Sequence, residues 1–256
     1  MSVEKVAVVI IGGGWHTPES YAKLARGLGD AGYDVHRPGN PSMVNQRQGA
    51  FGLAEDTKSM RAYVTKLVED GRRVIALAHS YGGQVASNSL TDLGWETRSR
   101  KRLPGGVIRI VFMCAFALLE GGSVIGQIKA MGDEALIPLA LDFAEDMTVV
   151  CRDPAMQFIG DAGASKEETE AYLNTLHRWN GRCMYDAISQ CSWRDIPVTY
   201  VYTKLDMTIP LDYQKSMVAC LEGNGRPVES YELDTTHCPN LTATNEITEI
   251  IKKIAD

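Results

Sequence analysis

Short hydrophobic runs alternate along the chain with longer segments in which hydrophobic residues recur at helical spacing. A short apolar run without charge is typical of a strand buried on both faces, and a period of about 3.6 residues is typical of a helix with one buried face. The pattern predicts strands over residues 5–11, 33–38, 74–78, 106–114, 197–203 and 228–233. It predicts helices over residues 18–28, 53–69, 84–90, 210–221 and 243–254.

This alternation predicts a single α/β domain over residues 1–256, with a six-stranded, mostly parallel sheet, helices on both faces and right-handed crossovers. Between residues 118 and 194 the alternation stops. No strand is evident there, and helical patterns dominate, including a capping box that begins at Ser165. We therefore expect residues 118–194 to form a helical lid over the carboxyl edge of the sheet.

One corner of the predicted sheet carries the clearest chemical signal. The apolar run 74–78 ends in A-H-S-Y-G, residues 78–82, after which a helix can follow at once. A serine at a sharp strand-to-helix corner presents its hydroxyl above the sheet, and small residues two positions before and after it allow the turn. Ser80 is therefore a candidate nucleophile, although the same pattern also occurs as a plain turn in other α/β proteins.

A nucleophilic serine needs a base, a carboxylate that orients the base, and donors for the oxyanion. Asp206 follows the predicted strand 197–203, and His237 follows the predicted strand 228–233. Both therefore lie at the carboxyl edge of the sheet, where ligands of open α/β sheets bind. The order serine, acid, histidine along the chain is compatible with a catalytic triad.

Other residues near these positions leave alternatives open. Asp212 or Asp234 could be the acid, since Asp206 could instead cap the helix that follows it. His79 precedes the candidate nucleophile and is expected to pack or to hydrogen-bond locally. Cys238 follows the candidate base, and we expect a small buried thiol there rather than a second nucleophile.

The charge balance limits the partners that suit the chain. It has 26 basic and 32 acidic residues, a formal net charge of −6. This favours a small-molecule substrate over nucleic acid or an anionic membrane surface. The six cysteines form no C-x-x-C pair, so we expect reduced thiols, no metal site and no organic cofactor. The sequence allows a homodimer without specifying one.

The N-terminus gives no sign of a targeting segment. Residues 1–5 lead directly into the first predicted strand and lack the basic segment, apolar core and cleavage site of a signal peptide. No apolar run approaches the length needed to span a bilayer. Together with the cysteine pattern, this predicts a cytoplasmic protein.

The motifs resemble those of the α/β-hydrolase superfamily, and within it the small plant methylesterases, the related hydroxynitrile lyases and their microbial relatives. The resemblance covers nearly the whole chain. It is carried by the loops that hold the acid and the histidine and by four segments: G-G-G-W at 12–15, A-H-S-Y-G at 78–82, F-A-L-L-E-G at 116–121 and W-R-D-I-P at 193–197. It implies the α/β-hydrolase fold, with a lid at about residues 118–194.

The resemblance also implies roles for individual residues. Ser80 would be the nucleophile, His237 the base and Asp206 the acid that orients the base. Backbone N–H groups would form the oxyanion hole, from Tyr81 and from Gly14 or Trp15. Aromatic residues are candidates to line the substrate pocket, namely Trp15, His79, Phe143, Phe158 and Trp179.

Two positions depart from the pattern of the relatives. Many of them carry a histidine-glycine pair at the head of the oxyanion loop, where this chain has Gly12 and Gly13. The hydroxynitrile lyases carry a lysine directly after the catalytic histidine, where this chain has Cys238. The second departure removes most of the support for a lyase.

The sequence therefore predicts a serine hydrolase that cleaves an ester, lactone or thioester through an acyl-enzyme. The length of the lid suggests a covered pocket and a medium-sized, mostly apolar substrate. Two alternatives remain. One is a lyase or carbon–carbon hydrolase that uses the same three residues as an acid–base apparatus. The other is a small-molecule receptor built on a hydrolase fold.

Overall fold

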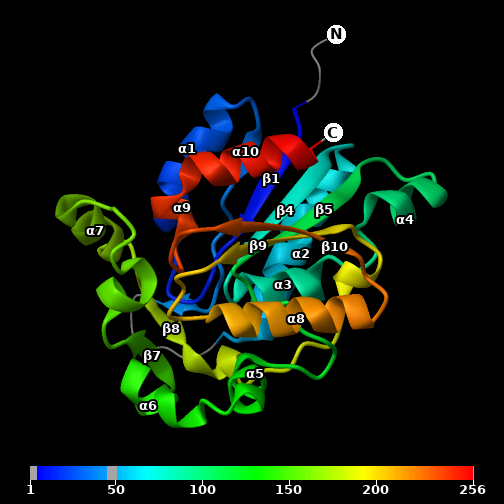
Figure 1. Ribbon diagram of the computed structural model, residues 1–256. Helices are drawn as coiled ribbons and strands as arrows, with labels where there is room; N and C mark the ends of the chain where they lie inside the picture. The colour runs from blue at the N-terminus through cyan, green and yellow to red at the C-terminus, as the bar shows by residue number, and fades with distance from the viewer. Residues whose placement is uncertain (1–4, 45–50, 256) are drawn as a thin grey trace.

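The computed structural model describes residues 5–44 and 51–255. A six-stranded sheet forms its centre, with the strand order β10-β9-β5-β4-β1-β2 and parallel pairing throughout (Figure 1). Its strands are β1 (Ala7–Ile11), β2 (Asp34–His36), β4 (Arg73–His79), β5 (Gly106–Met113), β9 (Val198–Thr203) and β10 (Val228–Leu233). All six predicted strands are confirmed, with ends that agree to within two residues.

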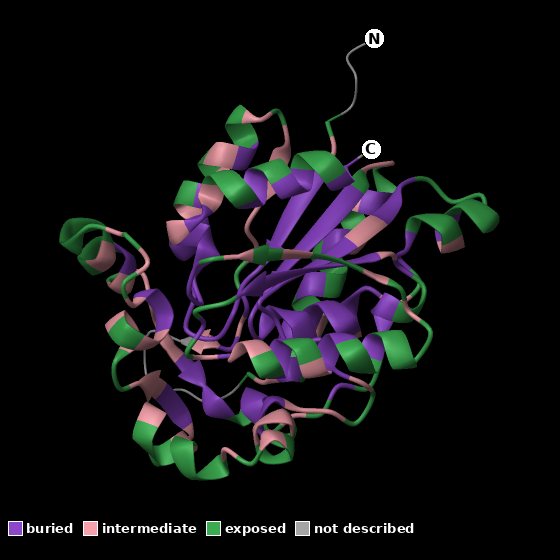
Figure 2. Ribbon diagram, in the orientation of Figure 1, coloured by how far each residue is buried: buried purple, intermediate pink, exposed green. Residues whose placement is uncertain are grey.

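Strand β1 shows why the apolar runs are continuous. Ala7, Val9 and Ile11 face one hydrophobic core, and Val8 and Ile10 face a second core on the other side of the sheet. The first core packs under α2 (Leu53–Glu69), α3 (Gly82–Ser89) and α8 (Leu211–Gly223). The second packs under η1 (Pro18–Tyr21), α1 (Ala22–Asp30) and α10 (Thr244–Ile254). Helices therefore cover both faces, and the four inner strands β1, β4, β5 and β9 are mostly buried, whereas the edge strands β2 and β10 are partly exposed (Figure 2).

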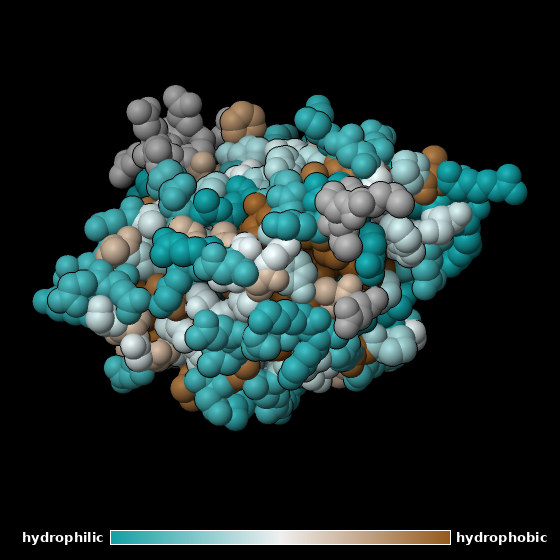
Figure 3. All heavy atoms as spheres, turned by 90° about the horizontal axis from the view of Figure 1, so that it is seen from above, coloured by the Kyte–Doolittle hydropathy of each residue, from teal (hydrophilic) through white to brown (hydrophobic). Residues whose placement is uncertain are grey.

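The predicted helices are all present. Helix α2 has the predicted bounds, and the segment predicted as a helix over residues 18–28 is a 3₁₀ turn, η1, followed by α1. Two short helices complete the main body, α4 (Trp95–Arg100) and α9 (Pro239–Thr242). The face of the molecule that carries α1 and α10 is covered mostly by hydrophilic side chains (Figure 3).

The lid segment differs from its prediction, because it contains strands as well as helices. Strands β6, β7 and β8 join β3 in an antiparallel sheet with the order β3-β8-β7-β6. The strands are β3 (Met43–Val44), β6 (Leu141–Phe143), β7 (Thr148–Cys151) and β8 (Arg178–Asn180). The helical elements are α5 (Val124–Met131), η2 (Glu134–Leu136), α6 (Ile137–Ala140), the π-helical η3 (Ala155–Ile159), α7 (Lys166–Leu173), η4 (Gly181–Met184) and η5 (Ser192–Arg194).

The expectation that residues 118–194 contain no strand was therefore wrong. These strands have only three or four residues, too few for a period of two to stand out from the sequence. The predicted capping box is confirmed, since Ser165 and Glu168 cap α7 reciprocally. The segment before α2 contributes β3 to the lid sheet, and residues 45–50 of that segment lie outside the described residues, as do residues 1–4.

Within the described ranges, no helix is long and apolar enough to cross a membrane.

Candidate active site

Ser80 lies at the corner between β4 and α3, with a backbone φ of 53°. This left-handed conformation costs a non-glycine residue about 1–3 kcal/mol and persists where the surroundings enforce it. At Ser80, contacts with neighbouring backbone enforce this conformation. The N–H of Phe116 donates to the carbonyl oxygen of Ser80 at 3.0 Å, and a Cβ added at Gly82 would lie 2.1 Å from the carbonyl oxygen of Ile11. Only a residue without a side chain at position 82 lets the helix start this close to β1.

Three residues predicted from separate loops form one hydrogen-bonded row. His237 Nε2 lies 3.0 Å from Ser80 Oγ, and His237 Nδ1 lies 2.8 Å from Asp206 Oδ2. Because an ionised carboxylate only accepts hydrogen bonds, the proton of the neutral imidazole sits on Nδ1. Nε2 is then free to accept from the serine hydroxyl. All three side chains are buried, and the row has the geometry of a nucleophile with its base and orienting acid.

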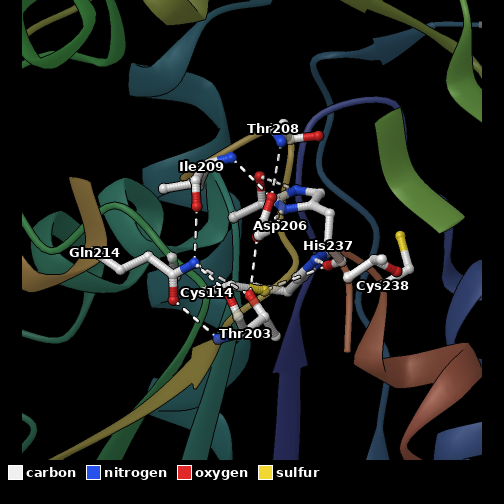
Figure 4. Close-up of polar contacts among 12 residues, drawn as sticks. Cys114, Thr203, Asp206, Thr208, Ile209, Gln214, His237 and Cys238 are labelled. Atoms are coloured by element: carbon white, nitrogen blue, oxygen red, sulfur yellow. Dashed lines mark hydrogen bonds and ion pairs between the residues drawn. The ribbon is translucent and has the colours of Figure 1, made fainter. Parts of the chain in front are cut away.

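The carboxylate of Asp206 is held by further donors (Figure 4). Its Oδ1 accepts the backbone N–H groups of Thr208 and Ile209, both at 2.8 Å. Its Oδ2 accepts the hydroxyl of Thr203 at 2.9 Å in addition to the imidazole of His237. These donors satisfy both carboxylate oxygens and leave the side chain little freedom to turn.

The two alternative acids lie elsewhere. Asp212 accepts the N–H of the next residue at the start of α8. Asp234 is exposed and forms an ion pair with Lys204 at 2.6 Å. Neither hydrogen-bonds to the imidazole of His237, so Asp206 is the acid that the fold brings to it.

Three backbone N–H groups near Ser80 are candidates to bind an oxyanion. Within the described chain, none of the N–H groups of Gly14, Trp15 and Tyr81 donates a hydrogen bond to a protein atom. The neighbouring N–H of Gly13 is already taken by the hydroxyl of Tyr21 at 2.8 Å. Tyr81 also sits at the N-terminus of α3, where the helix dipole favours negative charge.

A largely apolar pocket opens beside Ser80. It encloses about 810 Å³, part of it open to solvent, and Gly14 and Tyr81 contribute to the same wall as Ser80. The rest of the wall comes mainly from the lid and from the residues around the acid, and includes Phe116, Val124, Ile128, Leu136, Ile137, Met184, Met207 and Tyr213. Such a pocket suits an apolar ligand whose reactive group lies at Ser80.

Comparison with known sequences places the chain in a family. The profile of the alpha/beta hydrolase family matches residues 8–249. The chain belongs to the alpha/beta hydrolase family. A fungal relative, the alpha/beta hydrolase nvfD of Aspergillus novofumigatus, is 26% identical over 98% of this chain and 97% of its own length.

Solved structures agree with the fold of this alpha/beta hydrolase. Polyneuridine aldehyde esterase superposes with a TM-score of 0.78 at 17% identity, covering 99% of this chain and all of its own. An extracellular alpha/beta-hydrolase from a Paenibacillus species, described as similar in structure and function to tobacco salicylic acid binding protein 2, gives a TM-score of 0.74 at 22% identity. It covers 97% of this chain and 98% of its own. The predicted superfamily and fold are confirmed.

The predicted pocket aromatics of the hydrolase separate into two groups. Trp15 and Trp179 line the pocket, with their ring centroids 5.0 Å apart. Phe158 is buried outside it, behind the site, with its ring 5.8 Å from that of His237. Phe143 packs against Gly181 inside the lid. Phe158 and Phe143 are therefore not among the residues that line the pocket, since hydrophobicity alone does not tell which side of a lid element faces the ligand.

His79 does not line the pocket either, and it packs and hydrogen-bonds locally as the sequence predicted. The side chain is fully buried beneath the site, where its Nε2 donates to the carbonyl oxygen of His237 at 2.8 Å and its Nδ1 accepts from the hydroxyl of Tyr21 at 2.8 Å. Burial lowers the pKa of His79 well below its usual value, so the imidazole stays neutral. His79 therefore ties the loop of the base to the oxyanion loop, through Tyr21 and Gly13.

His16 forms a similar support on the other side of the oxyanion loop. Its Nδ1 donates to the carbonyl oxygen of Gly14 at 2.6 Å, and its Nε2 faces the thiol of Cys238 at 3.5 Å. Burial lowers the pKa of His16 to about 3, and burial raises the pKa of the Cys238 thiol. Cys238 is therefore the buried, uncharged thiol that the sequence predicted.

Sequence reasoning missed most of the pocket wall. Asp133 lies after α5 and Tyr213 on α8, and the Tyr213 hydroxyl donates to Asp133 Oδ2 at 2.7 Å. Asp133 is the only formally charged residue among the described residues that line the pocket. Met207 and Thr208 directly follow the acid, and this adjacency was the one available signal for them.

One cluster has the atoms of a metal site but not the freedom to bind a metal. Ligand-type atoms of His79, Cys114 and His237 lie within 4.8 Å of one another. The ring nitrogens of both histidines are already hydrogen-bonded, and burial raises the pKa of the Cys114 thiol well above its usual value. A metal needs free lone pairs and a thiolate, so these residues do not suit one.

Proposed function

We propose that this alpha/beta hydrolase is a serine hydrolase that cleaves a carboxylic ester, lactone or thioester through an acyl-enzyme. The observation that carries the proposal is the buried row Asp206–His237–Ser80, with contacts of 2.8 and 3.0 Å, at the wall of an apolar pocket. The likeness in fold to polyneuridine aldehyde esterase supports ester cleavage among the reactions of the family.

In the proposed reaction each residue of the row has one role. Ser80 Oγ attacks the substrate carbonyl while His237 Nε2 takes its proton, and Asp206 stabilises the resulting imidazolium. The N–H groups of Tyr81 and Gly14 bind the oxyanion of the tetrahedral intermediate. His237 then protonates the leaving group, and a water molecule repeats the attack on the acyl-serine, which releases the acid and restores the hydroxyl.

The pocket suggests the kind of substrate. Its wall consists mostly of aliphatic, aromatic and methionine side chains, which suit an apolar molecule. We therefore propose a mostly apolar ester or lactone in preference to a short, charged ester.

Active-site labelling tests the proposal. A fluorophosphonate probe should add to the wild-type protein by intact mass and should fail to add to Ser80→Ala and His237→Ala. Ser87→Ala is the matched control, because Ser87 is also a buried serine, but its hydroxyl bonds the carbonyl oxygen of Gly83 within α3. A folded wild-type protein that does not react would contradict the proposal and redirect attention to acid–base lyase chemistry or to a receptor.

A further inference from the structure

A buried carboxylate outside the catalytic row joins two walls of the pocket. Asp56 lies on α2 with none of its surface exposed. Its Oδ1 accepts the backbone N–H of Ser42 at 2.8 Å. Its Oδ2 accepts the hydroxyl of Ser42 at 2.5 Å and the hydroxyl of Tyr81 at 2.8 Å. One carboxylate thus satisfies three donors from two separate segments of the chain.

Both partners of Asp56 lead to the oxyanion hole. Tyr81 carries one of its proposed N–H donors. Ser42 accepts the indole N–H of Trp179 at 3.2 Å, and Trp179 lies directly over the other donor, since a Cβ added at Gly14 would be 2.6 Å from its ring. The rings of Tyr81 and Trp179 are themselves 4.8 Å apart. Asp56 is therefore the common anchor of the side chains that bound the hole on both sides.

Among the described residues, no cation lies against the carboxylate of Asp56. Within the part of the chain that the structure describes, no lysine or arginine forms an ion pair with Asp56, and the groups that face it are Ser42, Tyr81, Cys183 of η4 and, on its own helix, Glu55. Burial raises the pKa of Asp56 to about 6. A buried carboxyl without a cation destabilises the fold relative to an apolar residue, so its presence points to a gain elsewhere.

We propose that Asp56 is a positioning residue for the oxyanion hole, acting through the hydroxyl of Tyr81 and through the Ser42–Trp179 contact above Gly14. The inference rests on the proposed function, because the hole matters only if an oxyanion forms. The ionised carboxylate accepts all three donors, whereas the protonated acid has one acceptor fewer and releases or turns one of them. Asp56 itself does not touch the reacting atoms.

The test compares variants that each remove a contact between Asp56 and the oxyanion hole, with p-nitrophenyl butyrate as the ester substrate. Tyr81→Phe removes the hydroxyl but keeps the backbone N–H, and Asp56→Asn keeps the size of the side chain but not its second acceptor oxygen. Each should lower kcat about tenfold while KM changes less than about threefold, because the hole binds the transition state more strongly than the substrate. The double variant should be no slower than the slower single variant, since both changes remove one interaction.

Tyr200→Phe is the matched control. Tyr200 is also fully buried, and its hydroxyl donates to the carbonyl oxygen of Ala115 at 2.9 Å, away from Asp56. Its kcat should stay within about twofold of the wild type. If Asp56→Asn does not fold, Ser42→Ala serves in its place, because it removes the hydroxyl that contacts both Asp56 and Trp179. An unchanged kcat in folded Tyr81→Phe and Ser42→Ala, or an equal loss in Tyr200→Phe, would overturn the inference while leaving the hydrolase proposal intact. A folded wild type that neither reacts with fluorophosphonate nor hydrolyses the ester would overturn both.

Discussion

The edge of the six-stranded sheet and the lid meet at the same pocket, but they are built differently. At the sheet edge, backbone fixes the functional groups: Ser80 has a strained φ, and Gly82 lies against the carbonyl of a neighbouring strand. The lid has short strands and short helices, joined to the main body by contacts such as the β3–β8 pair and the bond from Trp15 Nε1 to the carbonyl oxygen of Val149. The sheet edge holds the residues of the proposed chemistry, and the lid segment contributes much of the pocket wall.

Gly82 shows most clearly how backbone fixes the edge of the sheet. A Cβ at position 82 meets the carbonyl oxygen of Ile11 at 2.1 Å and that of Gly12 at 2.9 Å, and this backbone cannot move aside. Gly82→Ala should lower the free energy of unfolding by about 3–4 kcal/mol, as measured by urea denaturation. Gly223→Ala on α8 is the control, because its Cβ meets nothing within 4 Å, and it should leave the free energy of unfolding unchanged or raise it by up to about 1 kcal/mol. Equal effects of the two substitutions would contradict the rigid-edge interpretation.

Asp56 sits where the two regions join, and its stability contribution should depend on pH. The pKa of its carboxyl rises from an ordinary value of 3.8 to about 6 on folding. Between these values the folded state binds more protons than the unfolded state, so stability falls as pH rises from about 4 to about 6 and stays lower above that. The shift of about two units corresponds to a loss on the order of 3 kcal/mol.

Asp56→Asn removes this titration and leaves the other carboxyl groups in place. The difference in free energy of unfolding between the wild type and Asp56→Asn should therefore decline across pH 4–6, as measured by denaturation at fixed pH values. A difference that is constant over this range would show that the carboxyl of Asp56 has the same proton affinity in both states.

Gly14 tests the contact between the regions directly. A Cβ at position 14 would lie 2.6 Å from the ring of Trp179 in the lid, so the ring would have to move to make room for it. Gly14→Ala should lower kcat for an ester about 100-fold by moving the N–H donor, with a smaller change in stability. Combining it with Trp179→Leu relieves the clash, and kcat should partly recover. A double variant as slow as Gly14→Ala alone would exclude the clash as the cause.

The smallest expected effect concerns selection by the lid. Asp133 is the only charged group on the described pocket wall, so it should disfavour an anionic substrate. Asp133→Asn should raise kcat/KM about fivefold for a p-nitrophenyl ester whose acyl chain ends in a carboxylate, and leave p-nitrophenyl hexanoate unchanged. Asp142→Asn should change neither ratio, because Asp142 pairs with Arg152 on the outside of the lid. Equal changes in kcat/KM for both esters in Asp133→Asn would show that the charge of Asp133 does not discriminate between the two substrates.

The same contrast explains what the sequence could predict. Ser80, Asp206 and His237 follow the ends of strands whose apolar runs are unambiguous, and parallel strands bring such ends to one edge. The lid segment has no such regular set of strand ends that meet at one edge. Its strands are too short to show a period, and Asp133 and Tyr213 meet although 80 positions separate them in the chain.

Asp56 was the exception, because the sequence held a usable signal for it. Leu53, Asp56, Met60 and Val64 recur at helical spacing along α2, which places the carboxylate on the buried face. A charged residue on an apolar face has to find buried partners, and here they are Ser42 and Tyr81. The partners themselves could not be read from the chain, since Ser42 comes from an irregular segment before β3.

The three imidazoles of His16, His79 and His237 lie in a row, with ring centroids 5.0 and 4.9 Å apart. They do not form a proton wire. His79 directs its one N–H at the carbonyl oxygen of His237, and the pKa of His16 is lowered to about 3. In the proposed mechanism, a proton taken from Ser80 would therefore have no onward path through these neighbours and would stay on His237 until the leaving group takes it. Proton transfer at this site would then involve one imidazole and no relay through the protein interior.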